Sequence, residues 1–192
     1  ILHTSLAGAP GHDPYAPCSV ADLRATDFRY WALGHVHKRF VADGPCTIVM
    51  PGNPQGRDIN EAGARSVTLG TIADDGSIRI EERCTSVAQF EGVVVDASGI
   101  AEWRDLIGAV AKAMERTRAS VAAGHLVVRL KIVGKTPLAW RIRSDLDLLR
   151  ADVEHRAAAT GACSVEKLEI ECQPSGTIPV SPGDPITELR RL

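Results

Sequence analysis

Two histidines separated by one residue, His35 and His37, are the side chains in this sequence best suited to metal chemistry. Each neutral imidazole offers one nitrogen lone pair, which suits a divalent metal ion. The aromatic and aliphatic run 28–33 before them predicts a buried strand. Because residues i and i+2 of a strand project from the same side, both rings can point into one site. For so short a motif, the alternative is a pair of ordinary surface or core histidines.

A third histidine, His3, lies in an apolar stretch at residues 1–6 that also predicts a strand. A proline-containing loop then leads toward the His35 motif. Gly34 precedes that motif, and its missing Cβ lets the backbone or a ligand come close where the strand ends. The sequence therefore contains two predicted strands that each carry histidine.

This order of motifs resembles the C-terminal half of a calcineurin-like metallophosphoesterase, and most closely the SbcD-type DNA-repair exonucleases. The segments that carry the likeness are 2–8, 12–18, 31–39 and 51–56. The resemblance implies a two-sheet α/β sandwich in which two metal ions clamp a phosphate and activate a water for in-line attack. It also implies that His3 and His35 ligate one metal ion and that His37 ligates the other.

The remaining ligands of that family come from Asp-x-His, Gly-Asp-x-x-Asp and Gly-Asn-His motifs, which do not occur in this sequence. The chain also begins at Ile1, inside a predicted sheet. We therefore expect a C-terminal portion that lacks the N-terminal half of the catalytic domain and carries an incomplete ligand set. No catalytic residue beyond the metal ligands is assigned. Of the divalent ions, manganese suits imidazole with carboxylate better than magnesium does, and magnesium is the second choice.

The composition is that of an ordinary globular protein. The chain has 192 residues, is 44% hydrophobic and carries a formal net charge of −2, so any attraction to DNA must come from a local patch. No apolar run is long enough to cross a membrane. The five cysteines form no Cys-x-x-Cys motif, which indicates reduced thiols in a cytoplasmic protein.

Hydrophobic periodicity divides the chain into an α/β part at 1–86, a second part at 87–173 and an extended tail at 174–192. The resemblance implies that the first is the end of the catalytic domain and the second a capping domain. In the catalytic part, Ser19 is the expected N-cap of a short helix, and Asp74-Asp75-Gly76 predicts a hairpin turn. The strands expected there, besides the two that carry histidine, are 46–50, 66–73 and 78–84.

The capping part predicts a small α+β module of β-α-β-β-α-β order, with both helices on one side of a mixed sheet. Its expected strands are 88–95, 125–133, 138–142 and 164–172, and its expected helices are 101–118 and 144–160. Ser144 is the expected N-cap of the second helix. The resemblance implies such a capping domain after the catalytic sandwich.

The alternation within strand 125–133 places Arg129 and Lys131 on its outward face. In the expected strand 138–142, the outward cation is Arg141, with Arg143 just beyond it. A hairpin through 134–137 would then place the four cations side by side as a strip for a DNA backbone.

A salt-bridged, solvated sheet surface is the alternative reading of that strip, and it is slightly favoured. Glu91, Glu169 and Glu171 are expected on the same outward side. Leu138, Trp140 and Ile142 are expected to point into the core. In the loop after the histidines, Arg57 and Arg65 are further candidates for phosphate contacts, with ordinary loop charges as their alternative.

Together with the resemblance, these patterns lead us to expect the C-terminal portion of a two-metal-dependent DNA exonuclease. One alternative is a phosphatase or cyclic-nucleotide phosphodiesterase of the same superfamily. Another is a non-catalytic module that positions DNA or docks a partner. The resemblance implies an ATPase partner with long coiled coils, and it leaves open whether the protein forms a homodimer.

Overall fold

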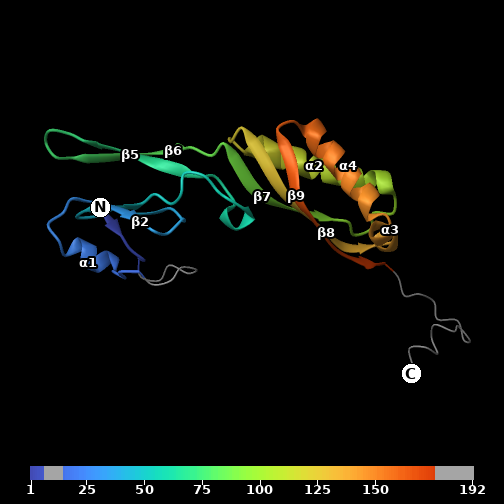
Figure 1. The fold of residues 1–192 in the computed structure, drawn as a ribbon, viewed down its shortest axis with the longest axis horizontal. Helices are drawn as coiled ribbons and strands as arrows, with labels where there is room; N and C mark the ends of the chain where they lie inside the picture. Colours follow the sequence, from blue (N-terminus) through green and yellow to red (C-terminus); the bar gives the residue numbers. More distant parts are fainter. Residues whose placement is uncertain (7–14, 176–192) are drawn as a thin grey trace, which may run out of the picture.

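Three β-sheets follow one another along the chain in the computed structural model, which describes residues 1–6 and 15–175 (Figure 1). Residues 7–14 of the predicted proline-containing loop lie outside the described residues, as does the predicted tail from 176 onward. None of the helices in the described part is both long and apolar enough to cross a membrane.

The first sheet has the order β1-β2-β4-β3. Its first three strands, β1 (Leu2–His3), β2 (Tyr30–Gly34) and β4 (Thr47–Met50), are parallel, and β3 (Phe40–Ala42) is antiparallel to β4. A single bridge between Leu6 and Cys18 extends the pairing.

A short helix, α1 (Val20–Arg24), covers the apolar side of this sheet, where Leu23 packs with Leu33, Ile48 and Met50. Ser19 caps the helix as predicted. Its hydroxyl accepts from the Asp22 N–H, while the Asp22 carboxylate accepts from the Ser19 N–H. Ser19 and Asp22 therefore form a capping box at the N-terminus of α1.

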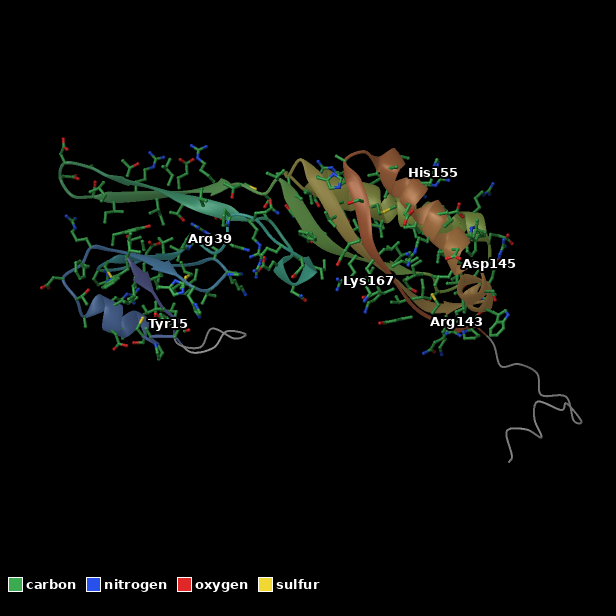
Figure 2. All side chains as sticks on the ribbon, viewed as in Figure 1. Tyr15, Arg39, Arg143, Asp145, His155 and Lys167 are labelled. Carbon is green, nitrogen blue, oxygen red and sulfur yellow. The ribbon has the colours of Figure 1, made fainter. Side chains whose placement is uncertain are left out.

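The second sheet is the predicted hairpin of β5 (Ser66–Ile72) and β6 (Ile78–Cys84). The turn is closed by the Ala73 N–H, which donates to the Ser77 carbonyl at 3.0 Å, and Gly76 takes the positive φ of +75° that the turn requires. Arg39 ties the hairpin to the first sheet by donating to Thr68 and pairing with Glu82 (Figure 2). Before the hairpin, the one-turn 3₁₀ helix η1 (Ile59–Glu61) was expected to be loop.

The third sheet consists of β7 (Ala88–Asp96), β8 (His125–Thr136) and β9 (Cys163–Pro174), in that order. All its strands are parallel, so the prediction of a mixed sheet was wrong. The helices α2 (Trp103–Ser120) and α4 (Leu146–Thr160) lie together on one face, as predicted (Figure 1). The core between them and the sheet includes Leu126, Val128, Leu130 and Ile132 of β8.

The predicted strand 138–142 is instead a helix, α3 (Ala139–Ser144). Strand β8 does not turn at Gly134 but continues to Thr136, whose hydroxyl accepts from the Leu138 N–H and starts a tight helical turn. Leu138 and Ile142 are buried, as both a strand and a helix would have them, but Trp140 is 74% exposed rather than in the core. Five alternating residues are too few to distinguish the two periods.

The expected Ser144 cap was also wrong. Ser144 ends α3, and its hydroxyl donates to the Trp140 carbonyl. Asp145 occupies the N-cap position of α4 without a side-chain capping bond. Because Ser144 is the last residue of α3, it is itself helical and cannot be the N-cap of α4.

The buried centre of β8 should contribute strongly to the stability of the third sheet. Leu130→Ala should lower the free energy of unfolding by about 2–5 kcal/mol, because Leu130 is fully buried between the sheet and its two helices. Denaturant unfolding measures the loss. Val94→Ala, at a β7 side chain that is 62% exposed, should change stability by about 0.5 kcal/mol or less. Equal losses in the two variants would contradict the assignment of this core.

Candidate metal centre

His3 and His35 meet at the ends of the parallel strands β1 and β2. The register pairs His3 with Gly34, so that His35 follows directly beyond the neighbouring strand. The His35 Nδ1 lies 3.1 Å from the His3 Nε2, and the ring centroids are 4.9 Å apart. Tyr15 lies edge-on to His3, with ring centroids 5.4 Å apart. Parallel strand ends thus bring together two histidines that are 32 residues apart in sequence.

Strand alternation does not place the second pair, His35 and His37. Strand β2 ends at Gly34, and His35 has a φ of +109°, which side-chain-bearing residues rarely adopt. Such a conformation costs about 1–3 kcal/mol and is typical of functional sites. The backbone turn, rather than a strand, sets where the two rings lie.

His37 is held by a carboxylate that the sequence analysis missed. Its Nδ1 lies 2.6 Å from the Glu61 Oε1, and the Glu61 side chain is 11% exposed. The other oxygen, Oε2, accepts from the Asn53 Nδ2 at 2.7 Å and from the Arg57 N–H at 2.9 Å. The Arg57 guanidinium pairs with the carboxylate at 2.9 Å. Glu61 is thus the centre of a cluster formed by His37, Asn53 and Arg57.

The same contacts control the ionisation of Glu61. Hydrogen bonds from the Arg57 guanidinium are the main cause that holds the pKa of this carboxyl far below its usual range. Bonds from His37, from the Arg57 backbone and from Asn53 also lower the pKa. Together, all these hydrogen bonds outweigh the burial, which by itself would raise it.

Local turns place the carboxylate. The Asp58 carboxylate accepts from the Asn60 N–H and so caps the one-turn helix that ends at Glu61. Arg57 and Glu61 are four residues apart, a spacing typical of ion pairs along a turn of helix. That spacing was the one local signal of the cluster, and it lay in a segment read as plain polar loop.

Arg57 and Arg65, the predicted phosphate contacts of this loop, have different surroundings. Arg65 donates to the carbonyls of Glu61, His37 and Ala62 at 3.1, 2.9 and 3.2 Å, and thus fastens the loop to the histidine segment. The Arg57 side chain is 70% exposed despite its bond to Glu61.

A hollow of about 710 Å³ opens beside His37. Its cationic lining residues are Lys38, Arg39, Arg57 and Arg65. Two carboxylates, Glu61 and Glu82, also line it. With cations in excess, this hollow suits an anionic group.

A metal ion fits this donor set in part. Two nitrogens bound to one ion at about 2.1 Å would lie about 3.0–3.4 Å apart, and the contacting nitrogens of His3 and His35 are 3.1 Å apart. Because Glu61 takes the Nδ1 of His37, a metal would use its Nε2. Within residues 1–6 and 15–175, however, no group of three or more His, Cys, Asp or Glu side chains could hold a metal ion. A direct hydrogen bond between the His3 and His35 rings is the alternative.

The predicted strip of four cations does not exist as such, because Arg141 and Arg143 belong to α3. Arg141 lies 4.9 Å over the Trp103 ring and contacts Asp145. Arg143 donates to the Cys172 carbonyl at 2.8 Å (Figure 2).

Arg129 and Lys131 do lie on the sheet face away from the helices, and both are ion-paired. Arg129 contacts Glu166 at 2.7 Å, and Lys131 contacts Glu171 at 2.9 Å and Glu169 at 3.7 Å. The salt-bridged surface that the sequence analysis slightly favoured is therefore the arrangement observed on this face.

Comparison with known proteins finds similarity to metallophosphoesterases. Residues 90–173 match the family described as the middle domain of the metallophosphoesterase YhaO. The chain is also 34% identical over 139 residues to a Bacillus subtilis (strain 168) protein described as the uncharacterized metallophosphoesterase YhaO. That alignment covers 71% of this chain and 33% of the relative, so the chain spans about a third of the relative's length.

The clamp made by Arg65 gives a local prediction. Arg65→Ala removes three donors from the carbonyls that join the loop to His37, so the loop should open more often. Hydrogen exchange should quicken at the amides of Asn53 and Gly63, which bond to the His37 and Phe90 carbonyls. Arg79→Ala, on the hairpin, is the matched control and should leave both amides unchanged. Equal protection in the two variants would show that Arg65 does not fasten the loop.

Proposed function

Since these comparisons support a place for the chain in the metallophosphoesterase family, we propose that it is part of a two-metal phosphodiesterase of the SbcD type that cleaves DNA. The observation that carries the proposal is the meeting of His3 and His35 at adjacent strand ends, with His37 held nearby in the chain by a buried carboxylate. A metal site built at strand ends has its ligands fixed by the sheet, which is what precise positioning of a phosphate requires.

The residues of this chain would contribute binding and orientation. His3, His35 and His37 would hold the metal ions, which when bound clamp the phosphate and supply an activated water. Glu61 fixes the His37 ring, and the exposed Arg57 side chain lies at the same hollow, where it could neutralise phosphate charge. The imidazole donors favour manganese over magnesium, and the carboxylates that complete the site would come from the N-terminal half of the catalytic domain.

The proposed DNA substrate rests on the excess of cations in the hollow beside His37. On the third sheet, a phosphate would have to displace glutamates from Arg129 and Lys131, which limits those two residues to a supporting role. A coiled-coil ATPase partner, which the SbcD resemblance implies, belongs to the same proposal. So does a cytoplasmic location, which the five cysteines without a Cys-x-x-Cys motif favour.

Activity should require the N-terminal half of the catalytic domain and manganese. The full-length protein is expected to degrade duplex DNA with manganese, whereas residues 1–192 alone should give no signal above the background. His35→Ala or His37→Ala in the full-length protein should abolish the activity, since each removes a ligand. His155→Ala, on α4, is the matched control and should retain activity. Metal-dependent cleavage by residues 1–192 alone would mean that the active site lies elsewhere.

Salt dependence separates phosphate contacts from ion pairs on the third sheet. If Arg129 and Lys131 contact phosphates, replacing both with Ala in the full-length protein should reduce the log–log salt slope of duplex binding by about 1.8, or about 0.9 for each contact. Fluorescence anisotropy at several salt concentrations measures the slope. Replacing Arg104 and Arg156, on the helices of the opposite face, is the control. An unchanged slope would mean that Arg129 and Lys131 form ion pairs with glutamates and do not contact phosphates.

A further inference from the structure

We propose that Glu61 is a positioning residue that holds the His37 ring with its proton on Nδ1, so that Nε2 is the nitrogen presented to a metal ion. This inference rests on the proposed function, because it assigns His37 to the metal. It adds a residue outside the ligand set that the sequence resemblance implies.

The orientation of the Glu61 carboxylate is fixed from both ends. Its Oε2 accepts from the Asn53 Nδ2 and from the Arg57 N–H, at 2.7 and 2.9 Å. Its Oε1 lies 2.9 Å from the Arg57 Nη2 and 2.6 Å from the His37 Nδ1. An ionised carboxylate can only accept hydrogen bonds, so the His37 Nδ1 must be the donor in that short contact.

A proton fixed on Nδ1 decides which nitrogen of a neutral ring can bind a metal. The lone pair then belongs to Nε2, and the bond to Glu61 also fixes the rotation of the ring. Carboxylates that hold a ligating histidine in this way typically change metal affinity or activity by about 10–100-fold when they are mutated.

The contact with His37 is not needed to hold the loop. Asn53 and the Arg57 backbone already satisfy one carboxylate oxygen, and the Arg57 guanidinium satisfies the other. Arg65 fastens the loop independently through backbone carbonyls. The bond to His37 therefore acts on the ring, whose side chain is 39% exposed beside the hollow.

Glu61→Gln tests the inference with a change of one heavy atom. The donors at Oε2 include a backbone N–H, whereas the guanidinium at Oε1 belongs to an exposed side chain that can turn away. The amide oxygen of glutamine should therefore occupy the Oε2 position, and its NH₂ group should face His37. The NH₂ group would then donate to Nδ1 and move the ring proton to Nε2, which blocks metal binding there. Glu61→Asp keeps an acceptor-only carboxylate and should keep the original tautomer.

Two measurements on the full-length protein follow. Nitrogen-15 spectra of labelled histidine, in metal-free protein, should report a proton on Nδ1 of His37 in the wild type and in Glu61→Asp, and on Nε2 in Glu61→Gln. Manganese affinity, measured by electron paramagnetic resonance, should fall about 10–100-fold in Glu61→Gln. Glu82→Gln, at a second carboxylate of the same hollow that pairs with Arg39, is the matched control and should change neither result. Circular dichroism checks that all variants are folded.

The outcomes separate the two proposals. An unchanged His37 tautomer in Glu61→Gln would overturn the positioning role whatever the protein does with metal. A changed tautomer with manganese affinity within twofold of the wild type would also overturn it. A wild-type protein that binds no manganese would defeat the proposed function, and the metal role of Glu61 with it, even if the tautomer responds as expected.

Discussion

A buried negative charge is the constraint on which the histidine region depends. Removing a carboxylate from water is costly unless donors replace the water, and Glu61 receives them from Asn53, His37 and both the backbone and the side chain of Arg57. These donors come from three points along the chain between residues 37 and 61. Satisfying one carboxylate therefore folds the loop, places an arginine at the hollow and fixes a histidine ring.

The histidines themselves depend on a different force, the parallel pairing of β1 and β2. Backbone bonds align His3 with Gly34, and His35 follows with a strained φ of +109° that the surrounding structure must hold. A rigid sheet supplies the position of one pair of rings, and a polar loop supplies the orientation of the third. Such a division is suited to a metal site, because ligands must be fixed both in place and in rotation.

The two faces of the third sheet differ: one packs against helices, and the other is covered by ion pairs. Its helices cover the face with Val128, Leu130 and Ile132, while Arg129 and Lys131 meet glutamates of β9 on the open face. The strands are parallel, so the residues that pair across them come from segments far apart in the sequence. Opposite charges at nearby positions of β8 and β9 make this open face an ion-paired, solvated surface.

The sequence by itself determined what short-range periodicity and capping can encode. The helices α2 and α4, the hairpin around Gly76 and the Ser19 N-cap were predicted because each depends on residues within a few positions of one another. The meeting of His3 with His35 was implied only by the family resemblance, and the parallel pairing of β1 with β2 produces it. Tertiary structure alone decided the rest. Glu61 reaches His37 across a sequence separation of 24 residues that includes the strands β3 and β4, and no repeating pattern marks that contact in the sequence. Arg141 and Arg143 left the predicted strip because β8 ran on past Gly134 and Thr136 started a helix, a choice between two periods that five residues cannot settle.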